Sequence, residues 1–265
     1  MNATFQWKCA LMASGVLFAV ASYAQTLPNS MAVMGDSISQ AAVADDGIDP
    51  NQPEHSWSTG DESGDGVNSH YERILAVNAG ISGNNYNNSV NGAKADDLMG
   101  QAINTVNQGV DYVTILMGGN DVCGDNVSDG ELTPTATYTA YFDDALDTLQ
   151  AGLPDATILV LEVPRVSRIY DVGRWNFGCQ FKWWVFGFCD NVLRNGSSQR
   201  NTATARNIEY NNALRSLTAS KGVFFDDDIF EVNFSRGDLS DTDCFHPAKS
   251  LQDDLASISY DAGRF

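Results

Sequence analysis

The residues of this chain best placed to do chemistry begin with Ser37, in the segment Gly35-Asp36-Ser37-Ile38-Ser39. The segment follows a short apolar run, Met31 to Met34, that is typical of a buried strand. A strand that ends in glycine and a tight turn brings the next side chains to the carboxyl edge of a sheet, where α/β proteins keep their binding sites. Ser37 is therefore a candidate nucleophile, although Gly, Asp and Ser are also ordinary turn residues.

A second segment with suitable chemistry is Asp243-Cys244-Phe245-His246-Pro247, near the end of the chain. Proline suits the first turn of a helix, so Pro247 is expected to fix His246 at a helix entrance. Asp243 can accept the Nδ1 proton of the imidazole and leave Nε2 facing Ser37. One loop would thus supply both a general base and the group that orients it.

Hydrogen-bond donors for an oxyanion are expected at two other strand ends. Gly83 lies in Asn78-Ala79-Gly80-Ile81-Ser82-Gly83, after the second apolar run. Asn120 lies in Gly118-Gly119-Asn120-Asp121, after the third. Each residue also has a structural interpretation, Gly83 as a turn with positive φ and Asn120 as a loop cap.

The elements that must position these residues follow from the apolar pattern. Five runs rich in β-branched residues predict buried strands at 30–34, 75–78, 112–117, 157–163 and 223–225. Helical spacing predicts helices at 69–75, 93–107, 139–153, 201–220 and 248–259. Strands that alternate with helices indicate a three-layer α/β/α fold around a doubly wound, five-stranded parallel sheet. Right-handed crossovers place the carboxyl ends of all strands on one edge.

The N-terminal residues 1–24 resemble a secretory signal peptide, because Lys8 precedes an apolar run, Ala10 to Val20, and small residues flank Tyr23. The run is too short to span a bilayer, and no later segment reaches the roughly 20 apolar residues that a spanning helix needs. We therefore expect an exported protein without a transmembrane segment, in which residues 25–265 form one domain.

The charge of the chain is strongly acidic, with 34 Asp and Glu against 15 Lys and Arg and a formal net charge of −19. Such a chain repels nucleic acid and, at long range, anionic membrane surfaces. The excess of acid indicates a solvated surface and makes nucleic acid an unsuitable partner.

Four cysteines follow the predicted signal peptide, and an even number in an exported chain favours two disulfides. Of the three possible connectivities, we expect Cys179 with Cys189, which are close in sequence, and Cys123 with Cys244.

Two further segments do not fit the alternation of strands and helices. Residues 174–188 contain seven Trp and Phe residues, which are either ordinary core or a partly exposed apolar wall or lid over a substrate pocket. Residues 45–68 are rich in Asp, Gly, Ser and Pro and are expected to form a long surface loop. Within and after it, Asp61, Ser63, Asp65 and Glu72 have the spacing of a calcium loop, with a plain acidic loop as the alternative.

Taken together, the chain resembles the SGNH hydrolase superfamily, the GDSL esterases and lipases. The resemblance rests on four segments in the family's order: Gly35 to Ser39 with Ile38 in place of the usual leucine, Ile81-Ser82-Gly83, Gly118 to Asp121, and Asp243 to His246. Ser56-Trp57-Ser58-Thr59-Gly60 and Asn68-Ser69-His70-Tyr71 also resemble segments of secreted bacterial members.

The resemblance implies a flavodoxin-like fold and a serine carboxylester hydrolase. Ser37 would attack the ester carbonyl, with His246 as base and Asp243 as its partner. The oxyanion would be held by the backbone N–H groups of Ser37 and Gly83 and by the Asn120 side chain. This mechanism needs no metal or other cofactor.

Three functions remain open from the sequence. The first is an esterase or lipase acting on small or lipid-like acyl esters. The second is a carbohydrate O-acetylesterase with the same four residues, in which exposed tryptophans would stack on sugar rings. The third is a binding domain that has lost catalysis, against which the intact Ser37, Asp243 and His246 argue.

Overall fold

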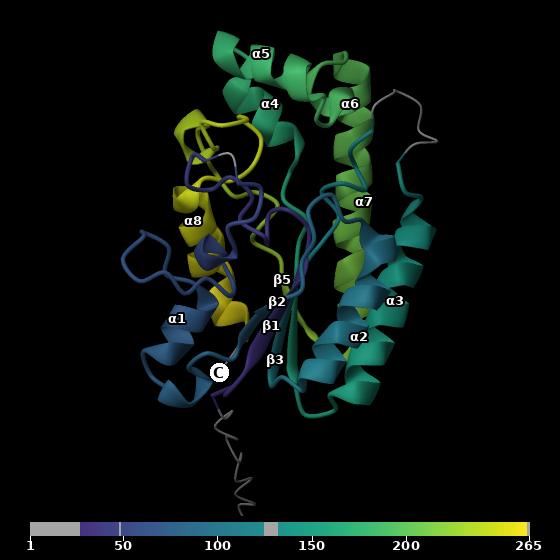
Figure 1. The fold of residues 1–265 in the computed structure, drawn as a ribbon. Helices are drawn as coiled ribbons and strands as arrows, with labels where there is room; N and C mark the ends of the chain where they lie inside the picture. The colour runs from purple at the N-terminus through teal and green to yellow at the C-terminus, as the bar shows by residue number, and fades with distance from the viewer. Residues whose placement is uncertain (1–26, 48, 125–131, 264–265) are drawn as a thin grey trace, which may run out of the picture.

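The computed structural model describes residues 27–47, 49–124 and 132–263, which fold around a five-stranded parallel sheet (Figure 1). The strand order is β2-β1-β3-β4-β5, and every neighbouring pair is parallel. The strands are β1 (Met31–Gly35), β2 (Asn85–Asn87), β3 (Tyr112–Leu116), β4 (Thr157–Leu161) and β5 (Phe224–Asp226). This order is a doubly wound one, whose direction of winding reverses between β1 and β3.

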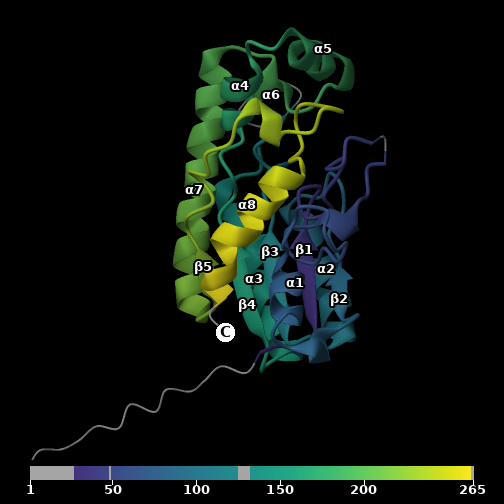
Figure 2. The same cartoon turned by 90° about the vertical axis from the view of Figure 1, so that its left-hand side faces the viewer.

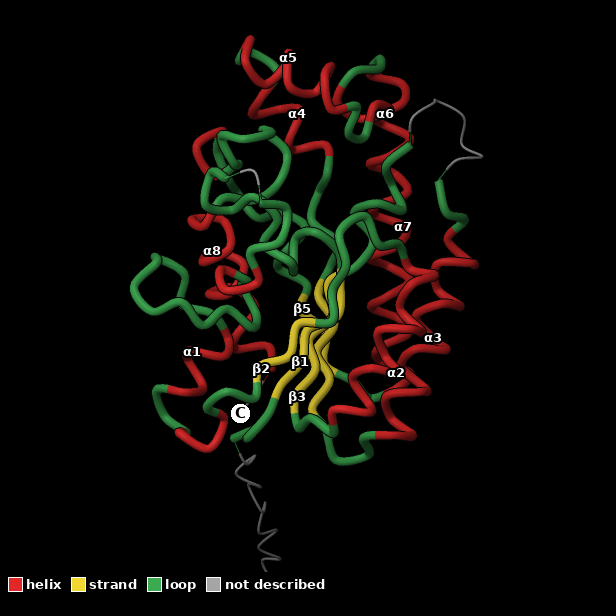
Figure 3. Tube along the Cα trace, viewed as in Figure 1, coloured by secondary structure: helices red, strands yellow, loops and turns green. Residues whose placement is uncertain are grey.

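Helices cover both faces of the sheet, as two perpendicular views show (Figures 1 and 2). One face carries α1 (His70–Leu75) and α8 (Lys249–Ser259), and the other carries α2 (Leu98–Gln108), α3 (Thr135–Gly152) and α7 (Ser197–Lys221). Three further helices lie beyond the carboxyl edge of the strands: α4 (Ser167–Gly173), α5 (Phe177–Phe186) and α6 (Asp190–Leu193). Long loops gather at the same edge (Figure 3). The predicted three-layer fold and its five helices are confirmed.

The central strands are buried on both faces, which explains their continuous apolar sequences. In β1, Met31 and Val33 pack into the hydrophobic cluster beneath α1 and α8, whereas Ala32 and Met34 pack into the cluster beneath α2, α3 and α7. All five residues of β1 are buried. The sheet therefore gives the turn after Gly35 a rigid base.

The prediction of the second strand is wrong. Residues 75–78 end α1 and begin a short 3₁₀ turn, at which the Asn78 side chain accepts a hydrogen bond from the Gly80 N–H. The observed β2 is Asn-Tyr-Asn at the edge of the sheet, and it pairs with Met31–Val33. An exposed edge strand this short and polar has no apolar run that a sequence pattern could detect.

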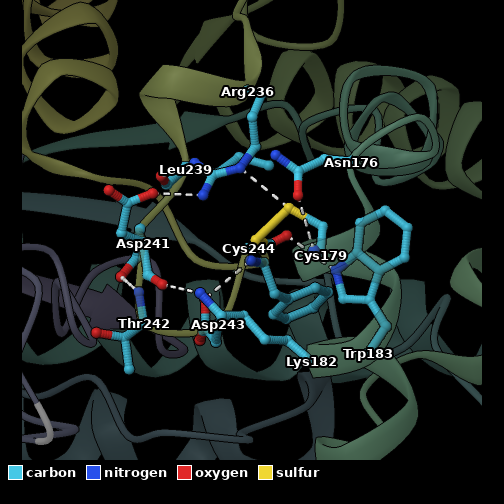
Figure 4. Close-up of a disulfide and its surroundings, with 12 residues drawn as sticks. Asn176, Cys179, Lys182, Trp183, Arg236, Leu239, Asp241, Thr242, Asp243 and Cys244 are labelled. Atoms are coloured by element: carbon cyan, nitrogen blue, oxygen red, sulfur yellow. Dashed lines mark hydrogen bonds and ion pairs between the residues drawn. A yellow bond between two sulfur atoms is a disulfide. The ribbon is translucent and has the colours of Figure 1, made fainter.

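The structure contains two disulfides, but their connectivity differs from the predicted one. Cys123 is bonded to Cys189, with the Cα atoms 4.5 Å apart, and Cys179 is bonded to Cys244, with the Cα atoms 5.3 Å apart (Figure 4). Cys179 and Cys189 do not pair, because each is bonded to another cysteine. Most of the segment between them is helix α5, which rises about 10 Å from Cys179 to Phe186 and directs the two cysteines to different loops.

Residues 1–24, the predicted signal peptide, lie outside the described part of the chain. Among the described residues, no helix combines the length and apolar character needed to cross a membrane.

Candidate active site

Ser37 lies in the turn that leaves the carboxyl end of β1. A Cβ atom at Gly35 would come within 2.5 Å of the Leu116 carbonyl oxygen, so only glycine lets β1 approach β3 this closely. The Gln101 side chain, from α2, accepts from the Gly35 N–H at 2.7 Å and donates to its carbonyl oxygen at 2.9 Å. These contacts fix the backbone two residues before Ser37.

Ser37, His246 and Asp243 form a hydrogen-bonded chain. The Ser37 Oγ lies 2.9 Å from His246 Nε2, and His246 Nδ1 lies 2.5 Å from Asp243 Oδ2. Ser37 and Asp243 are buried, and the His246 side chain is 12 % exposed. The structure thus brings together the three residues that the sequence proposed as nucleophile, base and orienting group.

The charge state of Asp243 suits its position beside the imidazole. Burial raises the pKa of Asp243, but hydrogen bonds from the His246 ring and from the backbone N–H groups of Phe245 and His246 outweigh burial and lower it below the ordinary value. Asp243 therefore stays ionised and favours the tautomer that carries its proton on Nδ1. Nε2 is then free to accept the Ser37 proton.

Hydrogen bonds join the two ends of the loop that carries Asp243 and His246. The Ser240 N–H donates to the His246 carbonyl oxygen at 2.9 Å, and Leu239 forms an antiparallel bridge with Pro247. Helix α8 starts at Lys249 with Ala248 as its N-cap, so Pro247 precedes the helix instead of lying in its first turn. The helix entrance still holds His246 in place.

Asn120 follows β3 and lies beside the same site. Its side-chain amide donates to the Ala93 carbonyl oxygen at 2.9 Å, which leaves the second N–H of the amide for another acceptor. Ser37 and Asn120 both line a pocket with His246. The Ser37 N–H donates to no acceptor among the described residues.

Gly83 does not lie at this site, which corrects the prediction that its N–H binds the oxyanion. Gly83 precedes β2, whose first residue, Asn85, pairs with Met31 at the opposite end of β1 from Ser37. At about 3.3 Å per strand residue, Gly83 is about 20 Å from Ser37. Its N–H donates instead to the Tyr71 hydroxyl at 2.9 Å.

A glycine that lies closer to Ser37 is Gly92, which the sequence pattern did not reveal as a candidate donor. It lies in the loop after β2, where the Val90 N–H donates to the Gly35 carbonyl oxygen at 3.1 Å. Its φ is +77°, and among the described residues its N–H donates to no acceptor. With the second strand at 85–87, Gly92 is the first glycine after that strand, in the segment Asn88-Ser89-Val90-Asn91-Gly92.

Two buried carboxyl groups, Asp36 and Asp121, support the loops around the nucleophile. Burial raises the pKa of Asp36 to about 6, and its Oδ1 accepts from the Ile38 N–H at 2.9 Å. Burial also raises the pKa of Asp121, whose Oδ2 accepts from the Ala95 N–H at 3.1 Å. Both groups act on backbone and not on the Ser37 hydroxyl.

The pocket beside Ser37 is narrow and mostly apolar. Its volume, open mouth included, is about 640 Å³. Its walls include Val166, Ile169, Phe234, Phe245 and Leu251, with Ser37 and His246 among its lining residues. A wall of this kind fits a hydrocarbon group attached to the carbonyl that Ser37 would attack.

The acidic segment after residue 60 uses two of its four predicted calcium ligands elsewhere. Asp65 Oδ2 lies 2.5 Å from Nδ1 of the buried His55, and Glu72 forms a capping box with Ser69 at the start of α1. In the described residues, Glu54, His55 and Glu62 are close enough to hold a metal ion together. Binding of calcium by Asp61, Ser63, Asp65 and Glu72 stays a prediction.

The sequence of this chain is similar to those of known proteins. The model of the GDSL-like Lipase/Acylhydrolase family matches residues 33–251. Human membrane-associated phospholipase B1 is 25 % identical over 198 residues, which cover 64 % of this chain but only 14 % of that much longer protein.

Solved structures share the fold at lower sequence identity. An acetyl xylan esterase superposes with a TM-score of 0.55 at 18 % identity, covering 88 % of this chain and 98 % of its own. An extracellular lipase from Streptomyces rimosus superposes with a TM-score of 0.51 at 17 % identity, covering 87 % and 97 %. Because the family model spans most of the sequence, from β1 into α8, the chain belongs to the GDSL-like lipase/acylhydrolase family, a family of carboxylic ester hydrolases.

Proposed function

We propose that this protein is an exported serine esterase that hydrolyses acyl esters of lipid type through an acyl-enzyme on Ser37. The observation that carries the substrate class is the apolar pocket, because its aliphatic and aromatic lining residues share the pocket with Ser37 and His246. The catalytic roles rest on the hydrogen-bonded chain from Ser37 through His246 to Asp243.

In the first half of the reaction, Ser37 Oγ bonds to the ester carbonyl carbon while His246 Nε2 takes the hydroxyl proton. The carbonyl oxygen becomes an oxyanion, for which the N–H groups of Ser37 and Gly92 and the Asn120 amide are the proposed donors. When the tetrahedral intermediate collapses, the carbon–oxygen bond to the alcohol breaks and His246 returns the proton to the leaving oxygen.

In the second half, His246 takes a proton from water, whose oxygen attacks the acyl carbon. The Ser37 ester bond then breaks, the fatty acid leaves, and Ser37 regains its proton from His246. Asp243 stabilises the imidazolium in both halves. The cycle thus ends with Ser37 and His246 in the protonation states in which it began.

Export is supported by the two disulfides, since such bonds persist in oxidising compartments. The predicted signal peptide at residues 1–24 is the second support.

The test is hydrolysis of an ester panel from acetyl to long-chain acyl groups, with phospholipid and acetylated xylan, using Ser37→Ala as the control. We expect acyl esters of lipid type to be preferred over acetylated xylan, and we expect Ser37→Ala to abolish turnover. A sharp preference for acetylated xylan would favour the carbohydrate O-acetylesterase. Complete inactivity of the wild type would favour a silent binding domain.

A further inference from the structure

Helix α5 presents an unusual concentration of large apolar side chains to solvent. The aromatic face consists of four residues on one side of α5 and of Trp175 just before the helix, with these exposed fractions: Trp175 86 %, Phe177 84 %, Phe181 57 %, Trp184 64 % and Val185 52 %. Leaving so much aromatic surface in water is costly, and contiguous patches of this kind mark sites that bind another apolar surface. Of the predicted aromatic stretch, Trp183 and Cys179 are buried and turn toward the body of the protein.

The opposite side of α5 is attached to the loop that carries the proposed catalytic base (Figure 4). Cys179 is bonded to Cys244, the residue directly after Asp243. The Trp183 Nε1–H donates to the Cys244 carbonyl oxygen at 3.0 Å, and the Lys182 ammonium contacts the Asp241 carbonyl oxygen. The aromatic face is therefore held in a fixed position relative to the site.

A chain of ring contacts joins Phe186, the last residue of α5 and 49 % exposed, to the mouth of the pocket. Phe186 stacks on Phe188 with ring centroids 5.5 Å apart, and Phe188 stacks on Phe245 at 5.2 Å. The Phe188 ring also meets the edge of the His246 ring at 5.8 Å. Because Phe245 and His246 line the pocket, apolar surface continues from α5 to the nucleophile.

The charge around α5 differs from that of the whole protein. Residues 165–188 contain four basic residues and one acidic residue, in a chain with 34 acidic and 15 basic residues. At the exposed end of the face, the Arg174 guanidinium lies 5.4 Å from the centroid of the Trp175 ring. Cations beside exposed tryptophan match the phosphate and acyl boundary of a phospholipid surface. The acidic remainder would be repelled by an anionic bilayer, so a zwitterionic surface is the better match.

We propose that the aromatic face of α5 docks on zwitterionic phospholipid surfaces and holds the pocket mouth against the lipid from which its ester substrate comes. This inference rests on the proposed function for the identity of the substrate, but docking itself needs no catalysis. It explains why a helix that contributes nothing to the pocket wall is covalently tied to the catalytic loop.

The test separates docking from catalysis by using Ser37→Ala in the full chain. Binding to phosphatidylcholine vesicles is measured by co-sedimentation for three proteins. The parent carries Ser37→Ala alone, the tryptophan variant also carries Trp175→Ser and Trp184→Ser, and the control variant also carries Tyr141→Ser. Tyr141 is a matched control, since it is an aromatic residue 36 % exposed on α3. We expect the tryptophan changes to weaken vesicle binding about tenfold or more and Tyr141→Ser to leave it unchanged.

A second measurement keeps Ser37 and follows a soluble short-chain ester and phosphatidylcholine vesicles as substrates. The tryptophan variant should keep kcat/KM for the soluble ester and lose turnover of the vesicles. Equal vesicle binding by the tryptophan and Tyr141 variants overturns docking, as does absence of binding by the parent. If the protein forms a dimer that Trp184→Ser dissociates, and binds no vesicles, lipid docking is overturned and the aromatic face binds a second copy of the chain instead. Undiminished soluble-ester turnover by Ser37→Ala would instead refute the proposed nucleophile and leave the docking result valid.

Discussion

The Asn120 side chain donates a hydrogen bond to the Ala93 carbonyl oxygen at 2.9 Å, which links the loop after β3 to the loop after β2. Ala93 directly follows Gly92, so one amide both fixes the Gly92 turn and keeps a second N–H, which we propose donates to the oxyanion. The two donor loops are thereby set relative to each other before substrate arrives.

Asn120→Ala should lower kcat about 10²- to 10³-fold, the usual cost of losing one oxyanion donor. Because Asn120 is only partly buried, the variant should unfold at nearly the wild-type temperature. Steady-state kinetics on a soluble ester, with thermal unfolding as the control, checks both expectations. Near-normal kcat would remove Asn120 from the site.

Gly92→Ala and Gly83→Ala form a matched pair that distinguishes the two candidate glycines. Both residues have positive φ, +77° and +74°, and an added Cβ meets no atom within 4 Å at either position. The backbone strain should therefore be similar, about 1 kcal/mol in each variant. Only Gly92→Ala should also misdirect an N–H at the site, lowering kcat about tenfold or more. Equal kcat values for the two variants would contradict the assignment of Gly92.

Asp243→Asn should lower kcat about 10⁴-fold while leaving the fold intact. The Asp243 Oδ1 also accepts from the Phe245 and His246 N–H groups, and the asparagine carbonyl can keep these bonds. Its amide would then face His246 Nδ1 and favour the tautomer with the proton on Nε2, which cannot accept from Ser37. A burst of acyl-enzyme formation at the wild-type rate in the variant would exclude this role.

The sequence predicts the parts of the fold that are buried on both sides. Strands β1, β3 and β4 appear as apolar runs because helices cover both faces of the sheet. Ser37 and Asn120 follow two of these runs, and His246 lies in the loop before α8, so the sequence predicts all three. The edge strand β2 has no such run, and misplacing it moved the predicted donor from Gly92 to Gly83.

The disulfide connectivity could not be predicted from the apolar pattern. It depends on α5, which the aromatic sequence of residues 174–188 did not reveal as a helix because its apolar side chains face both solvent and protein. Apolar periodicity predicts a helix only where the apolar residues face the core. In a docking surface such residues are exposed, so the apolar pattern of this segment does not predict the helix.

The two disulfides should contribute similarly to stability. They close segments of nearly equal length, with sequence separations of 66 and 65 residues. In the chain-entropy model, each then stabilises the fold by about 4 kcal/mol relative to the unfolded chain. Urea unfolding of Cys123→Ala/Cys189→Ala and of Cys179→Ala/Cys244→Ala should show comparable losses. A loss confined to one pair would mean that the other closes a segment already constrained in the unfolded state.

Acid should destabilise the protein through His70, which lies between the sheet and α8. The ring is fully buried, with Nδ1 2.9 Å from the Tyr112 hydroxyl and Nε2 2.9 Å from the Ser259 hydroxyl. Burial lowers the pKa of His70 to about 3, from an ordinary value of 6.5. The unfolded chain therefore binds a proton between pH 6.5 and pH 3 that the folded protein refuses, and the free energy of unfolding falls as pH falls through this range.

His70→Gln should remove this contribution while keeping a polar side chain between the two hydroxyls. The variant is expected to be less stable than the wild type at pH 7.5, where the wild-type ring is neutral in both states, and the difference should shrink toward pH 4. Because the carboxyl groups are common to both proteins, subtracting their unfolding free energies isolates His70. Urea unfolding at several pH values measures the difference directly. If the two stability curves run parallel, the pKa of His70 is the same in the folded and the unfolded protein, which would contradict the lowering by burial.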